Sequence, residues 1–458
     1  MLGYFAVRLD GLRGLASQWQ AFLSGADEPR SQKDKAAWLA RHDGFVAELV
    51  EFAGRQFRPG NADEALEAAA ALGFVCRQRQ ERLWEQYAQH GLKIVELTGE
   101  TRLEGGPEFR VRDVQTRRSQ SKPPAPFITA TLQQAAANQL RFSASRTMRI
   151  AQQLYEGVDI GNGEGPVGLI TYMRTDSTNL SAESIQAARS FIEQSFGRDY
   201  LPARPNIFAS SKRAQEAHEA IRPTDVFRTP ESLAGRLTDE QLKLYELIWR
   251  RFVACQMAPA QWDSTTVWIA AQTDRGEAVF KATGRVLVFD GYLRLTGDGE
   301  QAELPRLQTG QLLGLLQIEP QQHFTSPPPR YTEASLVRAL EAEGIGRPST
   351  YATIIQTIQD RGYVEQIDRK FYATPLGEAV TLKLIEHFPK IMDVRFTSHM
   401  EEQLDKIEEA HLDWTSVLRE FYEPFRESLV SAQATMDANP TEPSPYKCPA
   451  CGREMIYR

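Results

Sequence analysis

The chain has 458 residues, which is enough for roughly two to four domains. Hydrophobic residues make up 41% and charged residues 25%, a mixture that excludes a mainly disordered chain. No run of about 18 apolar residues suggests a membrane span, and the N-terminus has no secretory signal. Four cysteines are too few for a disulfide scaffold, so we expect a reduced, cytoplasmic protein.

The charge of the chain is unevenly distributed. The net charge of −7 argues against a surface that binds nucleic acid everywhere. Residues 110–149 nevertheless hold eight basic residues and one acid, whereas residues 401–440 hold ten acids and three bases. Taken alone, this pattern favours two solvated faces of opposite charge.

The first part of the chain predicts a mixture of helices and strands. Helices are expected at 12–24, 33–40 and 63–90. A strand is expected at 45–52, although its apolar run also fits a helix. Short alternating segments separated by turn residues predict a strand hairpin at 95–118. The prolines of 119–126 interrupt both kinds of element and mark a hinge.

The middle of the chain predicts a helical unit. Helices are expected at 129–140, 145–155, 181–196 and 237–257, a glycine-rich loop at 157–166, and an apolar strand at 167–173. Alternation with period two returns at 260–305. We therefore expect a mainly helical unit at 125–258, inserted between two parts of one sheet domain.

The last part begins after a second break at 326–329. Helices are predicted at 333–343 and 348–360, and two short strands at 362–374. Helix, turn, helix and hairpin are the outline of a winged helix, a common DNA-binding arrangement. Acidic helices are expected over 375–435.

The stretch GLITYMRTDSTNL at 168–180 carries the most unusual combination of side chains. On a strand, Tyr172 and Arg174 would share one face. A phenol with a pKa of about 10 becomes a useful nucleophile only beside cations, and arginine also binds phosphate bidentately. From spacing alone, a strand tyrosine beside a surface arginine is the more common interpretation. Residues 175–179 are typical turn and cap residues.

This stretch resembles the active-site segment of bacterial type IA DNA topoisomerases. Further similar stretches occur in the order of that family: KPPAPFITATLQQAA (122–136), AQQLYEG (151–157), QEAHEAIRPTD (215–225), LYELIWRRFVACQMAPAQWDSTT (244–266), YTEASLVRALEAEGIGRPSTYATIIQTIQDRGY (331–363) and KCPACG (447–452). The resemblance covers about 105–452 and is weak before residue 95.

The resemblance implies an activity and its catalytic residues. Tyr172 would attack single-stranded DNA and form a 5′-phosphotyrosine link, and Arg174 would position the phosphate. Strand passage and resealing would relax negative supercoils without ATP. The basic residues of 110–149 would contact DNA phosphates.

The resemblance also implies DNA-binding residues. Gln152 and Glu156 match positions near the nucleotide chain, and His218 matches a histidine close to the active site. Arg347, Ser349 and Thr350 would bind phosphate at a helix N-terminus. From the residues alone, His218 fits a packing histidine, and GIGRPST fits a turn with proline at the first helical position.

The chain departs from the family pattern in its metal ligands. Family members bind Mg²⁺ through an N-terminal Toprim domain with an Asp-x-Asp-x-Glu cluster, and no two aspartates here are two residues apart. The SAGRVQS segment is also missing. Cys448 and Cys451 supply half of a four-ligand Zn²⁺ site. We therefore expect a topoisomerase without Toprim and without most of its zinc ribbons, weakly active alone and completed by a separate Toprim chain.

The resemblance also implies an architecture. The fold class is mixed α and β, multidomain, with a helical catalytic domain inserted in a β-sheet arch domain and followed by a mostly helical domain. The expected boundaries are an N-terminal remnant at 1–44, the arch domain at 45–121 and 260–290, the catalytic domain at 122–259, the winged-helix domain at 291–436, and a linker with the start of a zinc ribbon at 437–458. We expect a monomer that binds DNA in the bacterial nucleoid and no membrane.

Two other interpretations remain open. The first is a non-catalytic single-stranded DNA-binding protein that uses the winged helix and the basic run. The second is an interaction protein whose acidic helices at 401–440 contact a partner. Only a topoisomerase would form a covalent adduct with DNA at Tyr172.

Overall fold

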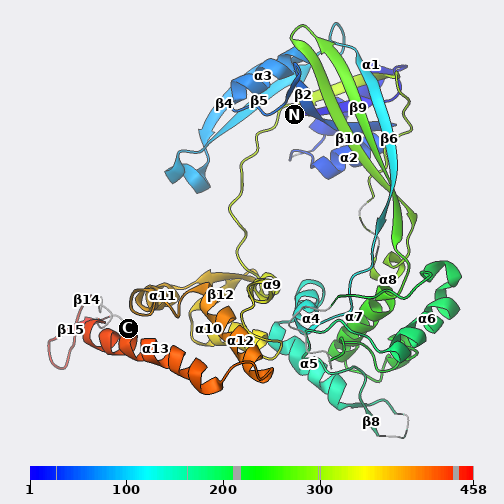
Figure 1. Ribbon diagram of the computed structural model, residues 1–458. Helices are drawn as coiled ribbons and strands as arrows, with labels where there is room; N and C mark the ends of the chain where they lie inside the picture. The colour runs from blue at the N-terminus through cyan, green and yellow to red at the C-terminus, as the bar shows by residue number, and fades with distance from the viewer. Residues whose placement is uncertain are drawn as a thin grey trace. The chain divides into compact units, whose positions relative to one another are not determined.

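The chain folds into two compact units, each made of two separate stretches (Figure 1). The computed structural model describes residues 1–26, 28–161, 163, 165–209, 218–297, 299, 301–436 and 443–456. The first unit comprises Met1–Pro123 and Met257–Pro327, and the second comprises Pro124–Gln256 and Pro328–Arg458. The predicted fold class, mixed α and β with several domains, is confirmed. Within the described residues, no helix combines the length and apolar character needed to cross a membrane.

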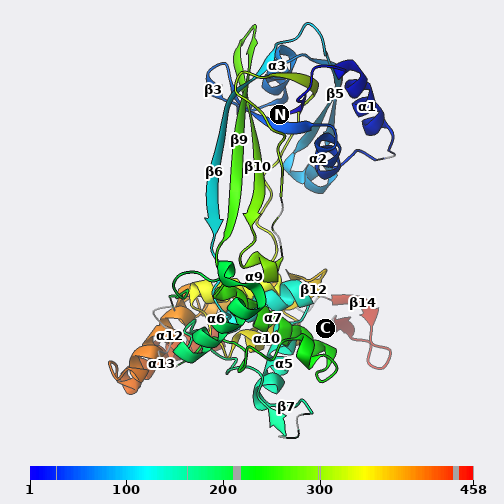
Figure 2. The same ribbon diagram turned by 90° about the vertical axis from the view of Figure 1, so that its right-hand side faces the viewer.

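The first unit is built on an antiparallel sheet with the strand order β1-β11-β6-β9-β10-β2-β3. Its strands are β1 (Leu2–Ala6), β2 (Gly44–Phe52), β3 (Arg55–Gln56), β6 (Phe109–Ser121), β9 (Ala260–Thr273), β10 (Gly276–Phe289) and β11 (Leu312–Glu319). Because β1 pairs with both β11 and β2, these strands close on themselves. Figure 2 shows the long strands β6, β9 and β10 side by side.

The first stretch of the second unit is connected to this sheet at one pair of residues. Strand β6 ends at Ser121, which pairs with Ala260 at the start of β9. The chain therefore leaves the sheet and returns to it at neighbouring positions. This register places residues 124–256 as an insertion between two adjacent strands, as the change of periodicity in the sequence suggested.

Alternation along β1 explains how helices cover this unit. Phe5 joins a core that includes aromatic rings from three other strands and buried residues of α3 (Ala62–Ala71). Tyr4 and Ala6 point to the opposite side, where they pack with Trp19 of α1 (Leu12–Ser24) and with α2 (Gln32–Ala40). Both α1 and α2 lie where the sequence predicts helices.

Two sequence predictions in this unit are wrong. The helix expected at 63–90 ends at Ala71 and is followed by strand β4 (Phe74–Leu83) and a 3₁₀ turn (Glu85–His90). The strands within 95–118 do not pair with each other, because β5 (Lys93–Thr101) pairs with β4 and β6 pairs with β9 and β11. Cross-strand pairs such as Arg82–Glu96 stabilise the β4–β5 hairpin and outweigh the helix propensity of its glutamines and arginines.

The second unit is mainly helical. Its helices are α4 (Thr129–Ala135), which continues into a π-helical turn (Ala136–Leu140), α5 (Ala144–Glu156), α6 (Ala182–Phe196), α7 (Asp239–Cys255), α9 (Glu333–Glu343), α10 (Tyr351–Asp360), α11 (Pro375–His387), α12 (Val394–Glu408) and α13 (Trp414–Thr435). A shared core of Ala130, Ala144, Val337, Tyr351, Ile355 and Phe371 joins both stretches of chain. The short α8 (Leu293–Thr296) belongs to the first unit.

The winged-helix outline predicted at 333–374 is present. Helices α9 and α10 are followed by the hairpin of β12 (Val364–Ile367) and β13 (Lys370–Ala373). Its two turn residues, Asp368 and Arg369, have φ angles of 47° and 64°. This left-handed turn matches the twist of a two-residue hairpin.

A buried ion pair in the first unit generates a pH-dependent prediction. Lys35 Nζ lies 2.8 Å from Glu319 Oε2, and the Tyr4 hydroxyl donates to the same carboxylate. Burial alone would raise the pKa of Glu319, but the hydrogen bonds from Lys35 and Tyr4 lower it below its ordinary value of 4.5. The pair should therefore stabilise the fold above that value, and the stabilisation should be lost as the pH falls through the lowered pKa.

We expect Glu319→Gln to decrease the free energy of unfolding at pH 7 by about 3 kcal/mol, because Lys35 stays buried without a counter-charge. Denaturant unfolding at several pH values, followed by tryptophan fluorescence, measures this. The difference from wild type should shrink at acidic pH. Glu51→Gln on the exposed side of β2 is the control, and an equal effect of both substitutions would contradict the prediction.

Candidate active site

The segment 168–180, which we call the tyrosine segment, is not the strand that the sequence predicts. Of the strand predicted at 167–173, only Val167, which ends β8 (Pro166–Val167), and a single bridge from Ile170 to Pro223 have strand character. The bridge is flanked by hydrogen bonds from the Thr171 amide to the Arg222 carbonyl and from the Thr224 amide to the Leu169 carbonyl. A ladder cannot continue across Pro223, because proline has no N–H to donate.

Two threonine hydroxyls hold this segment in place of a strand ladder. The Thr171 hydroxyl donates to the Ala220 carbonyl at 2.7 Å and accepts from the Arg222 amide at 3.0 Å. On the other side of Tyr172, the buried Thr129 hydroxyl of α4 donates to the Met173 carbonyl at 2.7 Å. It also accepts from the Thr175 amide at 2.9 Å.

This anchoring leaves the side chain of Tyr172 exposed. Its exposed fraction is 43%, whereas the next residue, Met173, is buried. The ring of Tyr172 meets that of Tyr155, at the end of α5, edge to face with centroids 5.3 Å apart. The phenol is thus accessible while its ring is supported from one side.

Arg174 faces a cleft of about 350 Å³, the Arg174 cleft, whose walls come from α5, from α10 and from the turn before α10. Within the described residues its guanidinium group has no hydrogen-bond or ion-pair partner. Ser349 lines the same cleft, as do Ala352 and Thr353 of the first turn of α10. The structure therefore brings Arg174 and Ser349 to the same cleft.

The N-terminus of α10 is open toward this cleft. Thr350 is its N-cap residue, but the Thr350 hydroxyl accepts from the Arg347 amide at 2.8 Å and caps no helix amide. The amides of Ala352 and Thr353 have no acceptor among the described residues. Uncapped amides at a helix N-terminus form a favourable site for an anion.

Arg347 is already engaged with α12. Its guanidinium donates to both oxygens of Asp405 at 2.8 Å and to the Glu401 carbonyl at 3.1 Å. The Glu401 carboxylate lies 3.5 Å away. The positive charge of Arg347 is therefore balanced within the unit, and a direct contact of this arginine with DNA stays a prediction.

The remaining predicted DNA-binding residues lie in two places. Gln152 donates to Glu156 one turn further along α5, and Glu156 follows Tyr155 directly in the chain. His218 is half-buried at the start of the stretch that pairs with the tyrosine segment. The rest of its motif at 215–217 lies outside the described residues.

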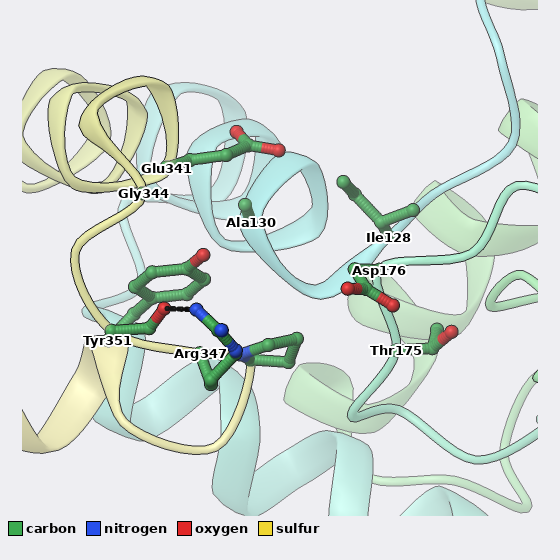
Figure 3. A pocket seen from close by; sticks show the side chains of 10 residues that line it. Ile128, Ala130, Thr175, Asp176, Glu341, Gly344, Arg347 and Tyr351 are labelled. Atoms are coloured by element: carbon green, nitrogen blue, oxygen red, sulfur yellow. Dashed lines mark hydrogen bonds between the residues drawn. The ribbon is translucent and has the colours of Figure 1, made fainter. Parts of the chain in front are cut away.

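A second, smaller cavity of about 140 Å³ lies beside the tyrosine segment, and we call it the Tyr351 cavity. Figure 3 shows Thr175 and Asp176 on one side and Tyr351 and Arg347 on the other, with Glu341 of α9 at the upper edge. Burial raises the pKa of Tyr351 to about 12, with Glu341 and Asp176 adding to the effect. The Tyr351 hydroxyl therefore stays protonated at neutral pH.

The two cysteines predicted as metal ligands lie at a small hairpin of β14 (Pro443–Lys447) and β15 (Glu454–Ile456). Hydrogen bonds from the backbone amides of Ala450 and Cys451 lower the pKa of Cys448. Within the described residues, no three His, Cys, Asp or Glu side chains are grouped to hold a metal ion. Two thiols do not complete a tetrahedral Zn²⁺ site, and residues 437–442 of the expected linker lie outside the described part.

An exposed tyrosine, a free arginine and an open helix N-terminus beside a winged helix suit the handling of a nucleic-acid backbone. The chain matches the DNA topoisomerase family model over residues 86–419, and it belongs to this family. The resemblance to bacterial type IA DNA topoisomerases is thereby confirmed.

Similarity to individual proteins supports membership of the same family. The chain is 48% identical to DNA topoisomerase 1 of Pseudomonas aeruginosa over 96% of its own length and 49% of that protein. It is 47% identical to DNA topoisomerase 1 of Escherichia coli, covering 76% of this chain and 40% of the relative. Full-length topoisomerase I of Thermotoga maritima matches with a TM-score of 0.64 and 37% identity, covering 83% and 60% of the two chains. The chain thus spans about half the length of the curated relatives it matches.

Sequence reasoning missed the residues that hold the tyrosine segment. Thr129 lies more than forty positions before the backbone groups that it binds, so spacing carries no signal for the contact. The one local indication was a pair of threonines, Thr129 and Thr131, at the start of a predicted helix. Thr171 is adjacent to Tyr172, but its partners at 220–222 depend on a long-range pairing.

Thr129 allows a direct test of the anchoring. We expect Thr129→Val, which keeps the shape but removes the hydroxyl, to increase amide exchange at Thr175 about fivefold, because a hydrogen bond is worth about 1 kcal/mol. Hydrogen exchange measured by NMR or mass spectrometry reports this. Thr129→Ser should restore protection.

Thr147→Val is the matched control, because the buried Thr147 hydroxyl donates only within its own helix, to the Ser143 carbonyl. If Thr147→Val loosens Thr175 as much as Thr129→Val does, the anchoring is not specific to Thr129.

Proposed function

We propose that this chain carries the strand-cleavage centre of a type IA DNA topoisomerase, with single-stranded DNA as its substrate. The observation that supports this most is the Arg174 cleft. There an unpaired guanidinium faces the open N-terminus of α10, two residues along the chain from the exposed Tyr172. Two kinds of phosphate-binding group thus converge next to a potential nucleophile.

The proposed reaction exchanges one phosphodiester bond for another. The Tyr172 oxygen attacks the phosphorus, the bond from phosphorus to the 3′-oxygen breaks, and the leaving 3′-oxygen takes up the proton lost by the phenol. Arg174 balances the charge that develops on the phosphate oxygens. Resealing is the reverse reaction, in which the 3′-hydroxyl attacks the phosphotyrosine. Because the phosphodiester bond is conserved, strand passage and relaxation of negative supercoils need no ATP.

The proposed reaction uses only side chains and helix amides of the described residues. Family members use Mg²⁺, but the described part holds no group of three metal-binding side chains. The described residues by themselves therefore do not fit a bound Mg²⁺ ion. We propose the relatives' topoisomerase activity, and DNA as the substrate, for this chain as well.

The second candidate function is non-catalytic binding of single-stranded DNA. The same cleft supports it, since an arginine and open helix amides bind phosphate whether or not cleavage follows. Covalent chemistry at Tyr172 separates the two functions.

A trapping experiment tests the catalytic proposal. A single-stranded oligonucleotide labelled at its 3′ end should become covalently attached to the wild-type chain, because the 5′-phosphotyrosine product keeps that end. The chain would be assayed alone and with the segments of the Pseudomonas aeruginosa relative that it does not span. Adducts would be resolved on denaturing gels. Tyr172→Phe should reduce the adduct at least a thousandfold, because removing a nucleophile removes the covalent path.

Tyr155→Phe is the matched control, because it keeps the ring that contacts Tyr172 and removes only a hydroxyl. It should form the adduct at nearly the wild-type level. Adduct formation by Tyr172→Phe, or its absence from wild type under both conditions, would contradict the catalytic proposal. DNA binding without an adduct would favour the non-catalytic alternative.

Arg174 generates a prediction about salt dependence. We expect Arg174→Ala to weaken binding of single-stranded DNA about tenfold and to reduce the slope of log K against log salt by roughly 0.7, the value of one phosphate contact. Fluorescence anisotropy at several salt concentrations measures both. Arg361, at the other end of α10, provides the control Arg361→Ala, and an unchanged slope in Arg174→Ala would refute the contact.

A further inference from the structure

We propose that Arg251 of α7 is a positioning residue for strand cleavage. It holds a short proline-rich stretch at 124–127, which we call the tether, and the tether holds the tyrosine segment through the stretch 220–224. The inference rests on the proposed function for the cleavage step. It adds a residue that does not line the Arg174 cleft.

The tether has few backbone groups that could hold it in place. Pro124 and Pro126 have no N–H group. Within the described residues, the backbone of 124–126 makes one hydrogen bond. Its donor is Nη1 of Arg251, which lies 3.3 Å from the Ala125 carbonyl oxygen. An arginine side chain therefore takes the place of the backbone pairing that the prolines prevent.

The same guanidinium group covers the last residue of the tether. Its Cζ atom lies 4.3 Å from the centroid of the Phe127 ring, and the ring is fully buried. A cation over an aromatic face is attracted more strongly when water is excluded. Ile248 and Phe252, on either side of Arg251 in α7, are buried, so a well-packed helix supports this arginine.

The tether is bound in turn to the stretch 220–224. Phe127 and Ile221 form an antiparallel bridge, in which the Ile221 amide donates to the Phe127 carbonyl at 2.8 Å. Both residues are fully buried. Because buried backbone groups must stay paired, a displacement of the tether is expected to displace Ile221 as well.

The other residues of the stretch 220–224 bind the tyrosine segment. Arg222 and Thr224 form hydrogen bonds near the start of the segment, and the Ala220 amide donates to the Asn179 carbonyl, near its end, at 2.8 Å. Neighbouring residues of an extended chain present their backbone groups to opposite sides. The stretch therefore joins the tether on one side to both ends of the tyrosine segment on the other.

This series of contacts connects Arg251 to the reacting group. The Thr171 amide, next to Tyr172 in the chain, donates to the Arg222 carbonyl at 2.9 Å. A nucleophile must be aligned with the phosphorus atom, and a misplacement of about 1 Å that originates far from the chemistry can lower a rate roughly a hundredfold. Arg251 thus affects cleavage through the backbone beside Tyr172.

A direct phosphate contact is the alternative role for an arginine. Arg251 directs its guanidinium group at a carbonyl oxygen and at a buried ring, which favours the positioning role. The two roles predict different salt dependence, because only a phosphate contact contributes to the slope of log K against log salt.

Hydrogen exchange of the full chain without DNA tests the contacts. Arg251→Met keeps an apolar side chain and removes both the donor and the cation. We expect it to increase exchange about tenfold at the Ile221 amide and about threefold at the Thr171 amide, because a charge-assisted hydrogen bond is a strong one. The Leu169 amide donates to the Leu154 carbonyl instead, so its exchange should be unchanged.

Covalent trapping tests the consequence for cleavage. The labelled oligonucleotide would be present at saturating concentration, together with the segments of the Pseudomonas aeruginosa relative. Arg251→Met should form the adduct about tenfold more slowly than wild type, because the nucleophile is misplaced. Its affinity for DNA and its salt slope should be unchanged. Arg251→Lys keeps a cation near the Phe127 ring and should recover the rate to within about threefold of wild type.

Arg189→Met is the matched control, because Nη2 of Arg189 on α6 likewise donates to a backbone carbonyl, that of Pro202, at 3.0 Å. It removes a similar contact away from the tether. Exchange at the Ile221 amide and the rate of adduct formation should both stay at the wild-type level. Arg251→Lys keeps the test possible if Arg251→Met folds poorly.

The outcomes distinguish this inference from the proposed function. Unchanged exchange at Ile221 in Arg251→Met, or loosened exchange with an unchanged adduct rate, would overturn the positioning role alone. Weaker DNA binding with a smaller salt slope would identify a phosphate contact and would also overturn it. Absence of an adduct from wild type would overturn the proposed function and the positioning role together.

Discussion

The local structure around Tyr172 depends on one constraint, which is that buried backbone groups must be hydrogen-bonded. The tyrosine segment cannot form a continuous ladder, since its neighbour at Ile170 is a proline. Threonine hydroxyls at 129 and 171 satisfy the backbone groups instead. They bury Met173 and leave the side chains on either side of it exposed, which is the geometry a nucleophile and a phosphate-binding arginine need.

Hydrogen bonding also decides the structure at the start of α10. The Thr350 hydroxyl accepts from the Arg347 amide in the turn before the helix, so it does not cap the first helix amides beside Arg174. Arg347 is bound by acids of α12, which explains part of the charge segregation seen in the sequence. The acidic region thus has at least one internal role, and the net charge of −7 does not conflict with a local phosphate site.

Most elements were predictable where local pattern and tertiary environment agree. Amphipathic helices such as α1 and α6 begin and end close to their expected positions, and the Ser181 side chain caps α6. The secondary-structure prediction failed where distant segments determine whether a strand can pair. The stretch 74–83 has good helix formers but becomes a strand beside β5, and 167–173 is apolar enough for a strand but faces a proline.

By itself, the sequence determined the family, because the order of its motifs is readable along the chain and identified a bacterial type IA topoisomerase. The resemblance also made Tyr172 and Arg174 candidates for phosphoryl transfer. Only the tertiary structure decided which distant groups meet. The contact of Thr129 with the Met173 carbonyl and the cavity shared by Asp176 and Tyr351 join residues far apart in sequence. Such contacts depend on how helices pack, and no local periodicity encodes them.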